Sequence, residues 1–444
     1  MEVTLINHSS LLFKFNKTSI LTDFWSETPA FGSWLPSAPP IYHPMYLASL
    51  SYQKDFVLCI SHAHDDHIDS VLLEKYFNKD MKIILNEFPS PSLKKRIQKL
   101  GFNNIINIKN DQILKMGDFE CISVFDNNIS NDDCGIAFRD KKYCIYHAND
   151  NHFVLSNKNT TKLKNFAKNR KFLFCSQTNT ASGYPISYYE FSPTEIKKEL
   201  EKKILLMVEN GLTNTKNCKA DFFLPYAGYS KTYVKDKKYH LMNIDPIYQN
   251  LCLIAKKSKK IKNIKKMVDI FCGGKINLLN GKVSYPFSYD PIKLIKLFDS
   301  YLINNKVVDK CDTFSNEFDK TDIDEKKIDN YLNEFLNFVH RYLERFPNFY
   351  NTVLNKTVCL EIQNNSKSIK KYLDIKNKKI KDDGDYNKKF VIPSNLFNAM
   401  YDKKIPFDNL YTGYEAEISR RPKNVYNRDL LMYFAMFGYK YKNS

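Results

Sequence analysis

The chain has 444 residues, 43% of them apolar and 14% aromatic, and a formal net charge of +18. This length is too great for one ordinary core and indicates two or three domains, and the absence of an uncharged apolar run of about 18 residues excludes a transmembrane helix. The charge is compatible with nucleic acid or an anionic substrate, but the lysines are spread over the whole chain, which favours a lysine-rich surface.

The N-terminal half alternates strands and helices. Residues 3–25 read as two strands and a turn, and the opening MEVTLINHSSLLFKF alternates like a strand and does not resemble a signal peptide. The run DFVLCI at 55–60 is continuously apolar, as in a strand that is buried on both faces. Further strands are expected at 81–86, 120–125, 135–138 and 143–146, and helices at 69–77, 93–100 and 193–211. This alternation predicts an αββα sandwich over residues 1–250, with the functional site at one edge between two sheets.

The C-terminal part is expected to enclose the substrate with a mostly helical cap over 251–364 and a small α+β unit over 390–444. The clearest helix covers 321–346, where Ile328, Phe335 and Val339 share one face. The polar stretch 365–389 between these units reads as a linker or mobile hairpin. The last unit should contain a short helix after Pro393, a strand at 411–418 and a helix at 429–437.

The ten cysteines stand singly, without a C-x-x-C pair. A chain of this size does not depend on disulfides for stability, so the pattern favours reduced thiols. Together with the lack of a signal peptide, it predicts a cytoplasmic protein.

The strongest chemical signal is His62-Ala63-His64-Asp65-Asp66-His67, directly after the apolar run 55–60. Residues two apart in an extended segment point the same way, so His62 and His64 can bind one metal ion. Asp66 and His67 follow one turn later and can reach an adjacent one. Imidazole and carboxylate groups are natural ligands of Zn²⁺ or iron, so one or two divalent ions are expected.

This HxHxDH pattern resembles the signature of the metallo-β-lactamase superfamily. Many members carry a bridging aspartate in a later segment that resembles Tyr146-His147-Ala148-Asn149-Asp150, so the resemblance implies that Asp150 is a further ligand. It also implies that Asp66 orients the reacting water in addition to binding metal.

The resemblance implies two more histidine ligands. One should precede Asp150 by some twenty residues, where the chain has FDNNISNDD and no histidine, so Asp126, Asn128 or Asp132 could substitute. The other should come late. His240, after the PYAGY loop, is the candidate, because a similar loop precedes the late histidine in the branch that contains the N-acyl-phosphatidylethanolamine phospholipase D.

A narrower resemblance extends over most of the chain. The segments INHSSLL, ILTDFWSETPAFGSW, NTASGYPISY, PYAGY and LYTGYEAEISRRPKNVY are similar to segments of the metallo-β-lactamase part of the CMP-N-acetylneuraminate hydroxylase family. The family resemblance implies that two of these loops line the cleft, through Ser182 and Tyr184 in one and Tyr226 and Tyr229 in the other. That family also has a Rieske domain, which needs C-x-H followed by C-x-x-H, and the present sequence contains no C-x-H.

Four functions remain open at this stage. The first is metal-assisted hydrolysis of a small anion, such as a sugar nucleotide, sugar phosphate or lipid phosphate, by a metal-activated water. The second is a di-iron oxygenase of a CMP-sialic-acid-like sugar nucleotide, with electrons from a separate protein. A nuclease and a non-catalytic binding protein are the others. Nucleic acid is not the expected partner, because the densest basic run, 256–266, has no interleaved aromatic residues.

Overall fold

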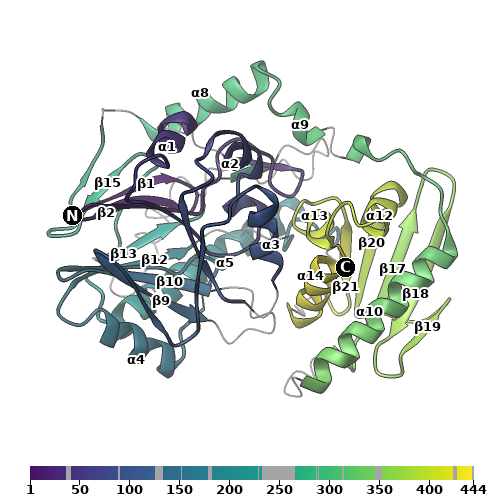
Figure 1. Ribbon diagram of the computed structural model, residues 1–444. Coiled ribbons are helices and arrows are strands. Elements are labelled where there is room, and N and C mark those ends of the chain that lie inside the picture. Colours follow the sequence, from purple (N-terminus) through teal and green to yellow (C-terminus); the bar gives the residue numbers. More distant parts are fainter. Residues whose placement is uncertain are drawn as a thin grey trace.

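The structure is a computed structural model that describes residues 1–36, 42–88, 91–125, 134–151, 153–178, 183–228, 230–232, 266–286, 288, 290–312, 315–345, 353–423 and 428–442. These residues form a larger lobe with two sheets and a smaller C-terminal lobe with one (Figure 1). In this part of the chain, none of the helices is long and apolar enough to cross a bilayer.

The first sheet of the larger lobe has eight strands in the order β16-β15-β1-β2-β3-β5-β6-β7. They are β1 (Glu2–Asn7), β2 (Ser10–Phe15), β3 (Thr18–Thr22), β5 (Phe56–Ile60), β6 (Lys82–Asn86), β7 (Ile105–Ile108), β15 (Lys275–Asn277) and β16 (Val283–Ser284). Tight turns that contain His8 and Asn16, with φ angles of 37° and 47°, join β1, β2 and β3 into an antiparallel meander. Strands β3, β5, β6 and β7 are parallel, so their carboxyl ends lie at one edge.

The second sheet has six strands in the order β13-β12-β11-β10-β9-β8. They are β8 (Ile113–Met116), β9 (Phe119–Phe125), β10 (Cys134–Arg139), β11 (Tyr143–His147), β12 (Lys171–Gln177) and β13 (Phe222–Tyr226). Strands β11, β12 and β13 are parallel to one another, so their carboxyl ends also share an edge.

Helices cover the outer face of each sheet, so the larger lobe is a four-layered αββα sandwich, as the sequence predicts. The helices are α1 (Pro44–Leu50), α2 (Ser70–Tyr76) and α3 (Ser92–Lys99) on the first sheet, and α4 (Asn157–Phe166) and α5 (Pro193–Asn217) on the second. Between the sheets, alternate side chains of the strands form the central core, where the rings of Phe13 and Phe138 lie 5.5 Å apart. Each such side chain contributes about 1.5–3 kcal/mol by leaving water.

The smaller lobe is built on a five-stranded sheet in the order β19-β18-β17-β20-β21. Its strands are β17 (Thr357–Gln363), β18 (Ser368–Asp374), β19 (Lys379–Lys381), β20 (Lys388–Pro393) and β21 (Glu417–Arg420), and its helices are α10 (Glu325–Arg345), α12 (Ser394–Tyr401), α13 (Phe407–Tyr411) and α14 (Arg428–Lys442). Helices α10 and α14 pack against each other, with the rings of Phe335 and Phe434 stacked 4.0 Å apart.

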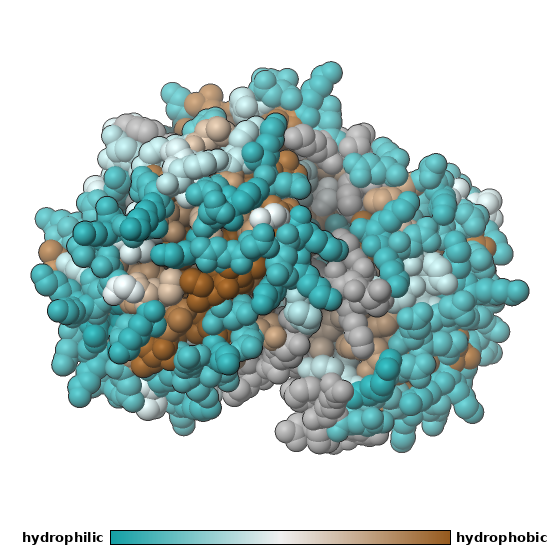
Figure 2. Space-filling model, in the orientation of Figure 1, coloured by the Kyte–Doolittle hydropathy of each residue, from teal (hydrophilic) through white to brown (hydrophobic). Residues whose placement is uncertain are grey.

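Shorter elements complete the described chain: α8 (Pro291–Asn304), α9 (Asp309–Asp312), the 3₁₀ turn η4 (Ser315–Glu317), and a two-stranded sheet of β4 (Trp34–Pro36) and β14 (Ser230–Thr232). Apart from a brown apolar patch on the larger lobe, the visible surface is mostly hydrophilic (Figure 2). This agrees with the high charge of the sequence.

The two lobes share one continuous apolar cluster. It joins Trp25, Phe31 and Trp34 of the larger lobe to side chains of the smaller lobe, and the ring of Tyr414 stacks on Trp34 at 5.7 Å. Gly413 fits this contact because a Cβ there would lie 2.4 Å from the carbonyl oxygen of Phe31. Residues 413 and 414 of the smaller lobe are therefore in direct contact with the larger lobe.

Two segments, 3–25 and 411–418, differ from the sequence expectation, and a third, 365–389, takes the hairpin form that the expectation allowed. Residues 3–25 form three strands, because the short apolar runs are separated by two tight turns. The polar segment 365–389 is a hairpin of β18 and β19 whose strands pair with β17 and with each other. Within 411–418, α13 ends at Tyr411 and β21 begins only at Glu417, since the turn between them packs against Phe31.

The interval 251–364 contains strands as well as helices. Strand β15 pairs with β1, so the first sheet continues with residues far beyond 250, and β17 begins at Thr357.

Candidate metal centre

The buried strand β5 delivers the HxHxDH segment to the carboxyl edge of the first sheet. His62 follows Ser61 directly after the strand, and a 3₁₀ turn, η1 (Asp65–His67), then redirects the chain. This turn points Asp66 and His67 back towards the sheet edge, where both are buried. The next helix starts at once because the Asp69 carboxylate accepts a hydrogen bond from the amide of Leu72.

Two groups of side chains at this edge are arranged as metal ligands: His62, His64 and Asp150 in the first, and His8, Asp66 and His67 in the second. In the first group, His62 Nε2 lies 2.7 Å from His64 Nδ1 and 3.5 Å from Asp150 Oδ2. The structure thus brings together the five described ligands that the sequence predicted, His62, His64, Asp66, His67 and Asp150.

The second group is equally compact. Asp66 Oδ2 lies 3.3 Å from His8 Nε2 and 3.5 Å from His67 Nε2. Asp150 stands between the two groups, because its other oxygen, Oδ1, is 3.8 Å from His67 Nε2. A carboxylate in that position can bridge two ions.

His8 is a candidate ligand that sequence reasoning did not select. It lies in the turn between β1 and β2, and the positive φ of that turn directs its ring to the edge where β5 ends. A single histidine in a loop gives no ligand spacing to recognise. The INHSSLL segment contained the only available signal, since this histidine is part of the resemblance quoted for it.

The buried carboxylate of Asp23 contacts groups that position the candidate ligands. Its carboxylate accepts hydrogen bonds from the amide and hydroxyl of Ser61, both at 2.8 Å, and contacts His147 Nε2 at 2.6 Å and His67 Nδ1 at 3.3 Å. His147 Nδ1 in turn lies 2.7 Å from the hydroxyl of Tyr226. This buried chain fixes the ring of His67 and the start of the HxHxDH segment.

The electrostatics of the site favour a bound cation. Burial alone would lower the pKa values of His64 and His67, but the surrounding carboxylates outweigh it and raise them to about 10 and about 9. Burial would raise the pKa of Asp66, but His67 and His8 hold it at about 2, and neighbouring histidines likewise keep the pKa of Asp150 well below its usual range. Without metal, protons therefore occupy positions that a divalent ion would take.

The residues present fit a metal ion. Asp66 Oδ1, His67 Nε2 and both ring nitrogens of His8 are buried and have no hydrogen-bond partner among the described residues. Buried polar atoms of this kind are costly unless something binds them. Donors restricted to nitrogen and oxygen suit zinc or iron, and they stand where the ligands of two adjacent ions would stand.

The other residues proposed from sequence have different positions. His240, Ser182, Tyr229, Asp126, Asn128 and Asp132 lie outside the described residues. Tyr226 is fully buried, and its hydroxyl contacts His147 and accepts from the amide of Asn149, so it supports the ligands and does not face a substrate. Tyr184 is half-buried beside Glu199 and Arg420, at the contact between the lobes.

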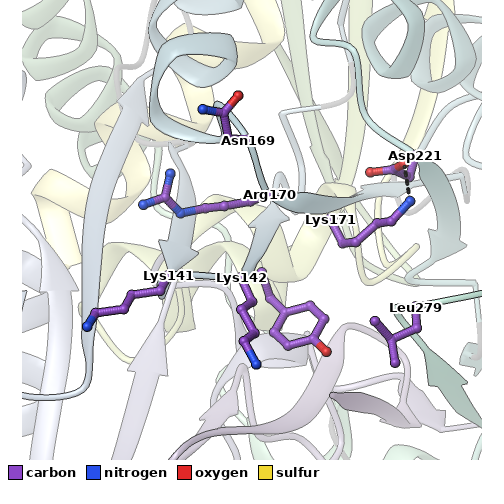
Figure 3. Close-up of a pocket in the computed structure, with 8 residues that line it drawn as sticks. Lys141, Lys142, Asn169, Arg170, Lys171, Asp221 and Leu279 are labelled. Carbon is purple, nitrogen blue, oxygen red and sulfur yellow. Dashed lines mark hydrogen bonds and ion pairs between the residues drawn. The ribbon is translucent and has the colours of Figure 1, made fainter.

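A surface pocket of about 450 Å³ lies at the opposite end of the second sheet (Figure 3). Its lining includes Lys142, Arg170, Lys171 and Asp221, next to the amino ends of β11, β12 and β13. Its charges are partly satisfied, since Lys171 pairs with Asp221 at 3.2 Å and Arg170 Nη1 donates to a backbone carbonyl. This pocket is a strand length away from the candidate metal ligands and is separate from them.

The αββα sandwich is that of a metallo-β-lactamase fold. Residues 2–167 match the family model of the beta-lactamase superfamily domain. That match includes the turn with His8, the HxHxDH segment and Asp150.

Curated relatives match a limited part of the chain. A protein of Mycolicibacterium smegmatis named as a Rieske 2Fe-2S iron-sulfur protein is 30% identical over 159 residues, which cover 34% of this chain and 30% of that protein. A protein of Mycobacterium tuberculosis with the same kind of name is 37% identical over 103 residues, or 23% of this chain and 19% of that protein. The chain thus spans less than a third of the length of these relatives.

Solved structures with a similar arrangement are distant. CmlA, a diiron beta-hydroxylase from Streptomyces venezuelae, is 13% identical with a TM-score of 0.35 over 51% of this chain and 44% of that chain. An isothiocyanate hydrolase from Delia radicum gut bacteria is 16% identical with a TM-score of 0.38 over 62% and 99% of the two chains. A possible metal-dependent hydrolase from Veillonella parvula is 13% identical with a TM-score of 0.40 over 62% and 98%.

Proposed function

We propose that the chain is a metal-dependent hydrolase that cleaves a small anionic substrate with a metal-activated water. The observation that carries this proposal is the pair of adjacent His/Asp groups with Asp150 between them. These residues would hold two ions, which when bound would lower the pKa of a bound water to about 7 and polarise the substrate. Hydrolysis needs no electron donor, so the ligand set is sufficient for it.

The protein groups divide the remaining work. His62, His64 and His67 would hold the ions as neutral imidazoles, and burial together with the neighbouring histidines already lowers the pKa of His62. With a pKa of about 2, Asp66 is ionised at neutral pH and too weak a base to remove a proton efficiently. Its oxygen Oδ1 can instead accept a hydrogen bond from the attacking water, which is the orienting role proposed for this residue.

The proposed substrate class is based on the charge of the site and of the protein. Metal ions at the sheet edge would attract a phosphate or carboxylate directly, and the net charge of +18 would steer such anions towards the protein. We propose a sugar nucleotide, sugar phosphate or lipid phosphate, bound with help from the loops of Ser182 and Tyr229, and not a nucleic acid.

A di-iron oxygenase that takes electrons from a separate protein is the second candidate. The observation that favours it is a donor set of imidazole and carboxylate groups, which suits iron as well as zinc, together with local identity to proteins named for an iron-sulfur cluster. Cys59 and Cys144, each three residues before a histidine, do not form such a cluster: both are buried in strands, and burial raises the pKa of both thiols. Among the described residues, the groups that could hold a metal contain only histidine and aspartate.

Metal analysis and reconstitution test the proposal. Protein purified without added metal is analysed by mass spectrometry, stripped, and reloaded with zinc or with ferrous iron. Hydrolysis of bis(p-nitrophenyl) phosphate and of CMP-sugars is then followed without oxygen. We expect about two ions per chain and hydrolysis that persists without oxygen.

A matched pair of variants identifies the site. His62→Ala should abolish activity and metal retention, whereas His43→Ala, an exposed histidine that caps α1, should change neither. Consumption of oxygen with an iron-loaded sample and a reductant, without any anaerobic hydrolysis, would establish the oxygenase instead. Full metal content and activity in His62→Ala would refute the ligand assignment.

A further inference from the structure

The outer nitrogens of His62 and His67 each have a polar partner within hydrogen-bond distance, and that of His64 has a carboxylate at ion-pair distance. His62 Nδ1 lies 2.9 Å from Ser61 Oγ and 2.8 Å from Asn149 Nδ2. His67 Nδ1 lies 2.9 Å from Ser9 Oγ and 3.3 Å from Asp23 Oδ2. Partners of this kind fix the tautomer and the direction of a ligating ring. For both of these rings, the partner belongs to the sandwich.

His64 differs in where its partner comes from. Its Nδ1 faces the candidate site, at 2.7 Å from His62 Nε2 and 3.7 Å from Asp150 Oδ2. A metal ion bound at Nδ1 requires the ring proton on Nε2, and that edge points to Asp408 Oδ2 at 4.0 Å. Asp408 is on α13 of the smaller lobe, in a part of the chain outside the residues that match the superfamily domain.

We propose that Asp408 is a positioning residue of the metal centre, through which the C-terminal lobe orients His64. This inference rests on the proposed metal-dependent function. It adds that the group beside His64 Nε2 comes from the smaller lobe. The carboxylate would hold the Nε2 proton of His64, leave Nδ1 free to bind the ion, and increase the basicity of the ring.

His64 has the greatest need for such a partner. Its side chain is 32% exposed, whereas those of His62 and His67 are 3% and 0% exposed. Packing therefore restrains this ring least. The edge of Phe31 covers one side of it, with ring centroids 5.9 Å apart. Asp408 itself is buried, and in such surroundings its charge acts on a neighbouring imidazole more strongly than it would in water.

The position of Asp408 is set by the contact between the lobes. Its carbonyl oxygen accepts from the amide of Thr412, which closes α13, and the carbonyl oxygen of Gly413 accepts from Ser33 Oγ at 2.7 Å. Phe31 connects this contact to the HxHxDH segment. Its carbonyl oxygen lies against Gly413, and its amide donates to Asp65 Oδ2 in η1. The contact between the lobes and the turn that carries Asp66 and His67 are therefore linked through Phe31.

Metal titration of the full chain tests the proposal. Metal-free protein is titrated with Co²⁺, and the visible absorption spectrum reports the affinity and geometry of each site. Asp408→Asn has nearly the same shape and should weaken one of two sites by roughly 10- to 100-fold and change its spectrum, since outer partners have effects of that size. Asp408→Glu should restore part of the affinity.

Two controls separate this role from general destabilisation. Asp402→Asn removes a carboxylate of the same lobe that pairs with Lys320 at 3.2 Å, and it should titrate like the wild type. Thermal melting of the metal-free variants shows whether Asp408→Asn folds normally.

The outcomes are distinct. Wild-type protein with two sites, and Asp408→Asn with the same affinities and spectrum, would overturn the role of Asp408 and leave the proposed function intact. Wild-type protein that binds no Co²⁺ would refute the proposed function itself. Weakening of one site in a normally folded Asp408→Asn supports the proposal.

Discussion

Replacing Asp23 with alanine is expected to destabilise the protein and weaken metal binding together. The carboxylate is fully buried and receives the amide and hydroxyl of Ser61 and the imidazole of His147. Without this carboxylate, the buried amide of Ser61 and Nε2 of His147 lose their hydrogen-bond partner. A stranded buried donor costs about 1–3 kcal/mol and a broken buried ion pair about 3–5 kcal/mol, so we expect a loss of about 3–5 kcal/mol.

The pH dependence has a defined sign. Burial alone would raise the pKa of Asp23, but His147 and His67 outweigh it and hold the pKa far below its usual range. A carboxylate whose pKa is lowered on folding contributes stability that is complete above its unfolded pKa of about 3.9 and is lost as the pH falls further. The difference between wild type and Asp23→Ala should therefore be constant from neutral pH down to about pH 5 and shrink in stronger acid.

Urea unfolding of metal-free protein, followed by circular dichroism, measures the stability, and metal titration should show an affinity loss of roughly 10- to 100-fold. Asp118→Ala is the control, because that exposed carboxylate also caps a turn, by accepting from the amide of Lys17. Its unfolding midpoint should match that of the wild type. An Asp23→Ala protein with the wild-type midpoint and affinity would refute the reasoning.

Three further outcomes are expected. His8→Ala should reduce the bound metal from about two ions to one, measured by mass spectrometry, and unchanged stoichiometry would remove His8 from the ligand set. Metal binding at pH 7 should release about two protons, since the pKa values of about 10 for His64 and about 9 for His67 keep both protonated without metal. Calorimetry in buffers of different ionisation enthalpy measures this, affinity should rise between pH 7 and 9, and identical heats in all buffers would contradict it. Gly413→Ala places a Cβ 2.1 Å from the carbonyl oxygen of Asn409, so melting should show a loss of about 1–3 kcal/mol, and an unchanged melting temperature would argue against the tight contact.

The part of the site that could be predicted from sequence is the part that is local. His62, His64, Asp66 and His67 follow one another within a strand end and one turn, so their spacing alone places them together. Asp150 is far from this segment in sequence, and it could be added only because the segment Tyr146–Asp150, at the end of β11, resembles one that carries a bridging aspartate in the superfamily.

The remaining groups are brought to the site by tertiary structure. His8 comes from the turn between β1 and β2, Asp23 follows β3, which pairs with β5, and Asp408 comes from the smaller lobe. Sequence spacing carries no trace of such proximity, since it depends on strand order and on how the lobes dock. Tyr184, proposed from a loop motif to contact the substrate, packs on the Arg420 guanidinium, 4.9 Å from its ring, and its contact with substrate stays a prediction.

The fold was predictable where strands are buried on both faces. The run before His62 is apolar throughout because helices cover one side of the first sheet and the second sheet covers the other. In contrast, β18 is buried at only two of its seven positions, Lys371 and Leu373, and its sequence reads as a polar linker. A strand with one solvated face has too few apolar residues to be distinguished from a loop by composition.

The pairing of β15 with β1 has a consequence for folding during translation. Val3 is synthesised long before its partner Ile276, which emerges only after most of the sandwich has been made. Contacts so distant along the chain make folding slow, because a large loop must close before they form. Until then, β1 is an unpaired edge, and the turn that presents His8 is attached to it. We therefore expect the nascent chain to gain full metal affinity late, after the segment with β15 has left the ribosome.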